Sequence, residues 1–491
     1  MKTTTRFAPS PTGYLHIGSL RTVLYNYLFA KKNDGKFMLR IEDTDRTRLV
    51  EGSVENMLGV LAEVGLIPDE GPNNPGELGP YYQSERLDIY KKYVDQLLEQ
   101  DKAYRCFCTS EELDQMRKEQ EELGLPTKYD GRHRYLSPEE IKEKLDAGIA
   151  HTVRLKVPKN IEVTFEDSVK GKITVASKDI DDQVLLKTDG FPTYHMAALV
   201  DDHLMGVTHV IRGDEWIPST PKHILLHEAL GWEPPVYSHL PLLLGTDKKK
   251  LSKRTGDVAV ENYLEKGYLN EALINYISLL GWNPKTTEEF FTLEELIDRF
   301  DISHVHKAGA VFDVERLNFF NAKYLKELSI DQLFSKFKLY LSRYDHEFLS
   351  IVENQNEIYV KKILEELSTR IQYFAQVKEL TTFFFEEPNI PSEDILVNQK
   401  MKIEDINMVK KSLQVSLDIL NSNDNLESID NIKSAYIEGI KSAGMKNGQV
   451  LWPTRAVLSG EQFSPGALEM IYILGKQKSI QRIQNALDKI K

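Results

Sequence analysis

The first eighty residues alternate between short apolar runs and stretches in which apolar residues recur at helical spacing. Residues 3–8 form a run that ends at Pro9, which predicts a strand. The residues that follow place one apolar face on a helix, formed by Leu20, Val23, Leu24, Tyr27 and Leu28. A second strand is expected at 36–43 and a second helix at 51–65. This order predicts a parallel sheet with crossover helices, as in doubly wound α/β domains.

The pattern changes over residues 81–188, where helical stretches mix with short strand-like runs. Helices are expected at 84–100, 110–123 and 137–147, and the segments "HTVRLKV" and "IEVTF" read as strands. This part therefore looks like an α+β insertion between two halves of the first domain. The α/β pattern resumes with "DQVLLKTDGFPTYHMAALVDDHL", and Thr220 and Pro221 are expected to begin a helix as N-cap and first residue.

From about residue 258 onward the chain reads as almost entirely helical. "HLPLLL" is the last strand expected before this part, and no convincing strand follows residue 325. Serine or threonine followed three residues later by glutamate predicts capping boxes at Ser137 with Glu140 and at Thr292 with Glu295. The C-terminal region is thus predicted to be all-α.

Composition and charge limit the function classes. The 491 residues suggest roughly three domains. No apolar run approaches the ~18 residues of a membrane span, and two cysteines suggest a reducing compartment, most simply the cytoplasm. A net charge of −13 argues against a nucleic-acid partner. Residues 441–491, however, carry 8 basic and 3 acidic side chains, which permits a polyanion contact there.

Two segments carry candidate phosphate chemistry. "RFAPSPTGYLHIGS" lies between a predicted strand and helix, where unpaired backbone N–H groups favour anions. Gly13 and Gly18 let the backbone approach a ligand, and His16 can donate to a phosphate oxygen. Alone, this segment could be a rigid proline turn with a surface histidine. The basic segment "KKKLSKR" could likewise be a solvated loop, but the pair in this order favours a polyphosphate site.

These segments resemble a known family. "HIGS" and "KLSKR" are similar to the paired ATP-binding motifs of class I aminoacyl-tRNA synthetases. Together with "RIEDTDRTR", "PYYQSER", "DGFPTYHMAALVDDHLMGVTHVIRGDEW" and "GAVFDVERL", they resemble the bacterial type of glutamyl-tRNA synthetase. "MKNGQVLWPTRAVLSG" and "SPGALEMIYILGKQKSIQRI" extend the resemblance almost to the C-terminus.

The resemblance implies a domain order and a reaction. It implies a Rossmann-type catalytic domain in two halves, at 1–80 and 189–245, separated by a connective insertion at 81–188 that binds the acceptor end of the tRNA. A stem-contact region would follow at 246–324 and an anticodon-binding region at 325–491. Glutamate would be joined to tRNA(Glu) through glutamyl-adenylate, with Mg²⁺ accompanying ATP and tRNA generally needed for the first step. The family is mostly monomeric, so a monomer is expected.

ATP-site roles follow from the same resemblance. His16 and Gly18 would contact the adenine side and the α-phosphate. The pyrophosphate would be stabilised by Lys253, with Lys250, Ser252 and Arg254 beside it. Ser19 stands where the class-wide motif "HIGH" has its second histidine, so any role of that histidine is absent.

Glutamate-site roles are also implied. Arg6 and Arg212 suit bidentate carboxylate binding, and Arg6 would take the side-chain carboxylate. Glu42 would face the α-ammonium, although pairing with Arg40 or Arg46 is an alternative for it. Three further residues would complete the pocket, namely Ser10, Tyr194 and Glu215. Core packing is an alternative for Tyr194.

Three points remain open in the sequence. Some family members bind zinc through a C-x-C pair and a second pair, here Cys106 and Cys108 with His133 and Tyr135. Tyrosine is a poor zinc ligand, so two small, partly buried cysteines are favoured and no metal is expected. Arg370 falls where the family often reads the third anticodon base. An enzyme that also charges tRNA(Gln) is the alternative function.

Overall fold

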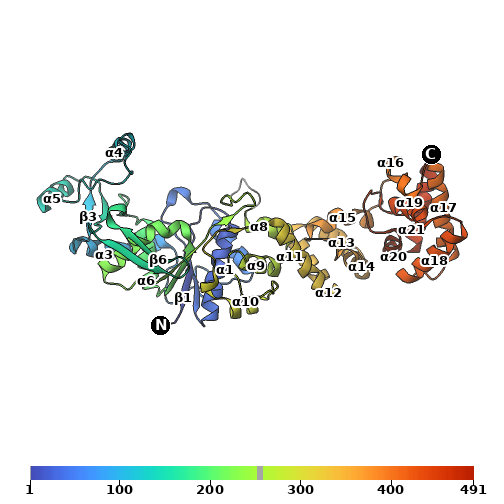
Figure 1. The fold of residues 1–491 in the computed structure, drawn as a ribbon, viewed down its shortest axis with the longest axis horizontal. Coiled ribbons are helices and arrows are strands. Elements are labelled where there is room, and N and C mark those ends of the chain that lie inside the picture. Colours follow the sequence, from blue (N-terminus) through green and yellow to red (C-terminus); the bar gives the residue numbers. More distant parts are fainter. Residues whose placement is uncertain (1, 252–257, 491) are drawn as a thin grey trace. The chain divides into compact units, whose positions relative to one another are not determined.

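The computed structural model describes residues 2–251 and 258–490, and its first structural unit is built on a parallel sheet (Figure 1). Strand β1 (Thr4–Phe7) pairs in parallel with β2 (Lys36–Leu39). Strand β8 (His209–Gly213) pairs in parallel with β9 (Val236–Leu240). The Thr208 amide donates to the Thr4 carbonyl over 3.0 Å, so β8 lies beside β1. The expected α/β architecture is confirmed.

Crossover helices cover this sheet as the apolar spacing predicts. They are α1 (Ile17–Lys32), α2 (Ser53–Glu63), α6 (Tyr194–Leu204) and α7 (Thr220–Leu230). On the predicted apolar face of α1, Leu20, Val23, Leu24 and Leu28 are fully buried and Tyr27 is partly buried. Because each such side chain contributes about 1.5–3 kcal/mol when buried, this face is enough to fix α1 on the sheet.

The insertion contributes a small sheet and a hairpin. Strands β3 (Ala103–Cys106), β4 (Thr152–Leu155) and β7 (Val184–Leu186) pair antiparallel. The helices of this part are α3 (Leu87–Glu99), α4 (Ser110–Glu122) and α5 (Pro138–Asp146). Strands β5 (Glu162–Asp167) and β6 (Gly171–Ala176) form a hairpin whose Asp167 pairs with Tyr237 of β9. The hairpin therefore extends the main sheet.

Two local expectations were wrong. The strand expected at 239–244 is interrupted at Pro241, because proline has no N–H to pair; β9 ends before it and β10 (Leu243–Leu244) pairs with β11 (Ala310–Val311). Thr220 is the first residue of α7 and Ser219 is its N-cap. The Thr220 hydroxyl instead accepts a hydrogen bond from the Arg212 side chain over 2.9 Å.

The chain divides into two compact units. The first comprises the residues up to Tyr263 together with Asn270–Val314, and it also contains α9 (Asn270–Ser278) and α10 (Leu293–Arg299). The second comprises Leu264–Leu269 and the residues from Glu315 onward. Helix α8 (Val260–Glu265) crosses the boundary.

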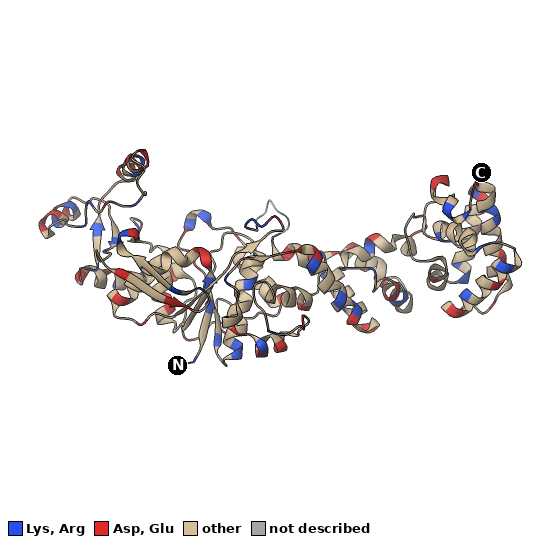
Figure 2. Ribbon diagram, in the orientation of Figure 1, with Lys and Arg blue, Asp and Glu red and all other residues tan. Residues whose placement is uncertain are grey.

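Among its described residues, the second unit has helices joined by loops and no β-strand. Its helices are α11 (Val314–Glu327), α12 (Ile330–Tyr344), α13 (His346–Glu353), α14 (Glu357–Leu367), α15 (Ala375–Phe385), α16 (Glu393–Leu396), α17 (Ile406–Ser422), α18 (Ile429–Ser442), α19 (Asn447–Ser459), α20 (Ala467–Leu474) and α21 (Lys476–Lys489). Figure 2 shows basic and acidic residues interspersed over these helices.

Two further expectations can be compared with the structure. Both predicted capping boxes, at Ser137 and Thr292, are present. Among the described residues, no helix combines the length and apolar character needed to cross a bilayer.

Candidate active site

A cavity opens at the carboxyl ends of the parallel strands, where α/β sheets bind ligands. Its volume is about 630 Å³. Nine of the residues expected in the site line it, namely Arg6, Ser10, His16, Gly18, Glu42, Tyr194, Arg212, Glu215 and Lys250. Although these residues are up to 244 positions apart in the sequence, the fold brings them to one place.

His16 forms the N-cap of α1 at one side of this cavity. Its backbone is extended, and its Nδ1 accepts a hydrogen bond from the Gly18 N–H over 2.9 Å. Because Nδ1 is the acceptor, the proton of the neutral ring is on Nε2. Gly13 in the preceding turn has φ +141°, a conformation that side chains rarely adopt. The turn thus combines a helix N-terminus with an N–H donor on the histidine.

The described residues on the two sides of 252–257 lie at the cavity and at this turn. The Leu251 amide donates to the Leu243 carbonyl over 3.0 Å, and Lys250 lines the cavity. After residue 257, the Ile17 amide donates to the Val258 carbonyl over 2.8 Å, and the Val260 amide donates to the Leu15 carbonyl over 2.9 Å. Three residues with expected roles, Ser252, Lys253 and Arg254, lie outside the described residues.

Arg212, at the end of β8, is a buried cation whose hydrogen-bond partners are neutral. Its Nε, Nη1 and Nη2 lie 3.1, 3.1 and 2.9 Å from His239 Nε2, Tyr194 Oη and Thr220 Oγ1. Among the described residues, no carboxylate forms an ion pair with this guanidinium. A buried charge without a counterion is costly, so Arg212 makes the cavity attractive to an anion.

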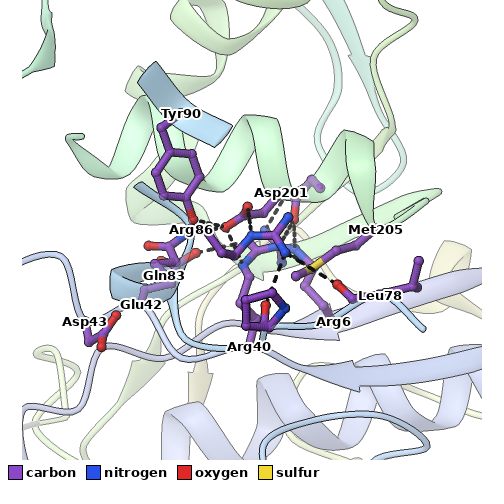
Figure 3. Close-up of polar contacts among 12 residues, drawn as sticks. Arg6, Arg40, Glu42, Asp43, Leu78, Gln83, Arg86, Tyr90, Asp201 and Met205 are labelled. Atoms are coloured by element: carbon purple, nitrogen blue, oxygen red, sulfur yellow. Dashed lines mark hydrogen bonds and ion pairs between the residues drawn. The ribbon is translucent and has the colours of Figure 1, made fainter. Parts of the chain in front are cut away.

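Arg6 and Glu42 belong instead to a buried network of charges (Figure 3). Arg6 is held by Asp202 through contacts of 3.0 and 3.2 Å. Arg40, at the centre, contacts Asp202 at 2.8 Å and Glu42 at 3.1 Å. Burial raises the pKa of Glu42 to about 7, although the positive charges of Arg40 and Arg6 oppose this shift. Glu42 therefore both pairs with Arg40 and faces the cavity.

Tyr194 combines packing with a polar contact. Its ring lies 4.2 Å, between centroids, from the ring of Trp216. Its hydroxyl accepts the hydrogen bond from Arg212 described above. The packing alternative and the cavity-lining placement thus both apply to this residue.

Several residues of the site were not found by sequence reasoning. They are Asp202 in the network, and Asp167, Thr220 and His239 around Arg212. The sequence names Arg40 only as an alternative partner of Glu42, and that pairing is present. The only local signals were two adjacent aspartates in an apolar helix and a histidine inside a predicted strand. Their partners lie far away in the sequence, so no local spacing pairs them.

Two cysteines and a histidine cluster in the insertion. Cys106, Cys108 and His133 offer donor atoms that lie within 4.8 Å of one another. The Tyr129 hydroxyl, and not the exposed Tyr135, lies beside them, 3.3 Å from Cys106 Sγ. Two thiols and an imidazole are donors typical of structural zinc sites, which take four ligands, and this cluster offers three of them. Bound there, a zinc ion would cross-link the end of β3 to the loop that carries His133.

Arg370 belongs to the second unit. It follows α14, is exposed, and its Nη2 forms an ion pair with Glu366 at 2.7 Å. Exposed pairs of this kind contribute little to stability, so the guanidinium can exchange Glu366 for another partner at small cost.

Comparison with known families identifies the class. A family described as "tRNA synthetases class I (E and Q), catalytic domain" matches residues 2–319. A family described as "Anticodon binding domain" matches residues 332–487. With the parallel sheet, the histidine-capped helix and Lys250 in the same cavity, these matches define a class I aminoacyl-tRNA synthetase.

Full-length relatives then narrow the class. A glutamate–tRNA ligase of Clostridium tetani is 46% identical, with 100% of this chain and 98% of the relative covered. A glutamate–tRNA ligase of Chloroherpeton thalassium is 44% identical, with 99% of this chain and 98% of the relative covered. A crystal structure of a glutamate tRNA ligase from Elizabethkingia meningosepticum, in complex with its amino acid, superposes with a TM-score of 0.90 at 38% identity, covering 100% of both chains. The chain belongs to the glutamate–tRNA ligase family.

Proposed function

We propose that this protein joins L-glutamate to tRNA(Glu) in two steps. The α-carboxylate of glutamate attacks the α-phosphate of ATP, forming glutamyl-adenylate and releasing pyrophosphate. The acyl group then passes to the 3′-terminal adenosine of the tRNA and AMP leaves. The observation that carries the proposal is that one cavity is lined both by the N-terminus of helix α1, at His16 and Gly18, and by the buried Arg212 cation.

The nucleotide side needs positioned donors and no nucleophile from the protein, because glutamate itself attacks. The Nε2–H of His16 and the backbone at Gly18 suit the α-phosphate, where negative charge grows during the displacement. Lys250, Ser252, Lys253 and Arg254 suit the leaving pyrophosphate, with Lys253 as the principal residue. Mg²⁺ accompanies ATP as part of the substrate.

The amino-acid side must bind two carboxylates and one ammonium. Arg212 and Arg6 supply the positive charges, and Arg6 still has Nη1 beyond its contacts with Asp202. Glu42 supplies the negative charge for the ammonium, and Ser10, Tyr194 and Glu215 complete the wall. Glutamine has one carboxylate fewer than glutamate, so its binding would leave more of the positive charge of Arg212 and Arg6 unbalanced, which disfavours it.

The helical second unit is proposed to bind the anticodon. Exposed guanidinium groups can stack on unpaired bases and donate to their edges, and Arg370 is the candidate for the third anticodon base. The positive excess in residues 441–491 suits phosphate contacts. The proposal places a monomer in the cytoplasm, with tRNA as its macromolecular partner.

The proposal is tested by ATP–pyrophosphate exchange with glutamate, with and without tRNA, followed by charging of purified tRNA(Glu) and tRNA(Gln). We expect glutamate-dependent exchange that is stimulated by tRNA, and charging of tRNA(Glu) well above tRNA(Gln). Absence of exchange under both conditions, with folded protein, would reject the enzyme. Equal charging rates would replace the proposal with the alternative that tRNA(Gln) is also a substrate.

A further inference from the structure

Behind Arg212, a chain of buried hydrogen bonds ends on a carboxylate. His239 pairs directly with Arg212 across β9 and β8, and its Nε2 accepts from Arg212 Nε over 3.1 Å. Its Nδ1 lies 2.6 Å from Asp167 Oδ2. Both His239 and Asp167 are fully buried side chains. The order of the chain is therefore guanidinium, imidazole, carboxylate.

These hydrogen bonds fix which nitrogen of the His239 imidazole carries the proton. Because His239 Nε2 accepts from a guanidinium that cannot lose its proton, the ring proton is on Nδ1 and is donated to Asp167. Burial lowers the pKa of His239, so the ring is neutral in spite of its hydrogen bond to Asp167. Backbone N–H groups of Val169, Lys170 and His239 also donate to Asp167, at 3.0, 2.7 and 3.1 Å. The carboxylate is thus fully hydrogen-bonded and ionised.

Arg212 differs in this respect from the other two arginines of the site. Arg6 and Arg40 contact Asp202 directly, so a protein carboxylate already balances their charge. The neutral imidazole of His239 separates Arg212 from the carboxylate of Asp167. This separation fixes the direction of Nε while the positive charge stays available to an incoming ligand.

We infer that Asp167 and His239 are positioning residues that set Arg212 for a carboxylate of glutamate and keep its charge unpaired until glutamate binds. The inference rests on the proposed function, and it assigns a role to the β5–β6 hairpin. By pairing with β9, this hairpin delivers Asp167 to the rear of the amino-acid site.

Asp167→Asn tests the inference because it reverses the direction of the hydrogen bonds between residue 167, His239 and Arg212. The asparagine oxygen can still accept the hydrogen bonds from the Val169 and Lys170 N–H groups, so its amide NH₂ faces His239 Nδ1. The ring proton then moves to Nε2 and points at the Nε–H of Arg212. We expect the KM for glutamate to rise about tenfold or more, as loss of a hydrogen bond to a charged group implies, while the KM for ATP changes less than about twofold.

The matched control is Asp69→Asn, an aspartate of the same unit that does not line the cavity and pairs with Lys31. It should leave both KM values unchanged. Nitrogen-15 NMR of labelled histidine, with the His239 signal assigned through its loss in His239→Gln, reports the ring tautomer. A reversed tautomer with an unchanged KM for glutamate would overturn the inference, as would a parallel rise of both KM values.

If Asp167→Asn fails to fold, the inference is tested by comparing the KM for glutamate of His239→Gln with that of His239→Leu. Glutamine keeps an acceptor for Arg212 and a donor for Asp167, so it should recover most of the glutamate affinity that leucine loses. Equal KM values in the two variants would contradict the inference. A wild-type protein without glutamate-dependent exchange would instead contradict the proposed function, so the two failures are distinguishable.

Discussion

Glu42 has to satisfy two opposing demands as a single residue. It is buried beside Arg40, which stabilises its ionised form, but burial itself favours the protonated form and raises its pKa to about 7. A carboxylate attracts an ammonium group only when it is ionised. The free protein should therefore lose its attraction for the amino group of glutamate as the pH falls through about 7.

This residue gives a pH prediction. Between pH 8 and pH 6, kcat/KM for glutamate should fall about tenfold, because the ionised fraction of a group with a pKa near 7 falls by that factor. Pyrophosphate exchange at subsaturating glutamate over this pH range measures it. Glu42→Gln should be less active and lack this slope. A wild-type profile that is flat between these pH values would contradict the assignment.

At the scale of elements, helix α6 connects the insertion to the N-terminal strands of the first unit. Near its C-terminal end, Asp201 accepts hydrogen bonds from Arg86, Gln83 and Tyr90 at 2.7, 2.9 and 2.8 Å. The neighbouring Asp202 holds the arginines of β1 and of the segment after β2. One buried turn of helix thus connects the insertion helix α3 to both N-terminal strands.

Removing this connection should be costly. Asp201→Asn leaves the buried Arg86 without its carboxylate, so the free energy of unfolding should fall by about 3–5 kcal/mol. Asp95→Asn, at an exposed position of α3, should stay within about 0.5 kcal/mol of wild type. Urea unfolding followed by circular dichroism compares the two, and equal midpoints would show that α6 is not held in this way.

Elements were more accessible to sequence reasoning than their contacts. The apolar spacing of Leu20, Val23 and Leu24 fixes α1 because one buried face is enough to define a helix. The Asp202 partnership with Arg6 spans 196 positions, and no periodicity encodes a pairing of that length. The resemblance supplied the cavity-lining residues, but it supplied neither Asp167 nor His239, whose roles depend on how β5, β9 and β8 lie side by side.

At the scale of the whole molecule, two structurally separate units serve one proposed reaction. The first holds the cavity, and the second holds the candidate anticodon contact Arg370. The proposed roles therefore assign selection of the tRNA and selection of the amino acid to different residues, and we expect each to be altered independently.

Arg370→Gln should relax the choice of tRNA without changing the choice of amino acid. Loss of an arginine that reads a base costs about 1–3 kcal/mol, so charging of tRNA(Gln) relative to tRNA(Glu) should rise about tenfold. The KM for glutamate should be unchanged. Arg343→Gln, at another exposed arginine of the second unit, is the matched control. An unaltered ratio in Arg370→Gln would remove this residue from anticodon reading.

The short segment Leu264–Leu269 limits how a chain of this kind could lose its second unit. It precedes the last part of the first unit but packs with the second, where the Leu269 amide donates to Asn321 Oδ1 over 2.8 Å and Gly267 O accepts from Phe374 N over 3.2 Å. A stop codon placed after Val314 would remove residues that pack on this segment, whose Leu264, Tyr268 and Leu269 are buried. A shorter descendant would need new polar side chains there, so loss of the helical unit is an evolutionary change of at least two steps.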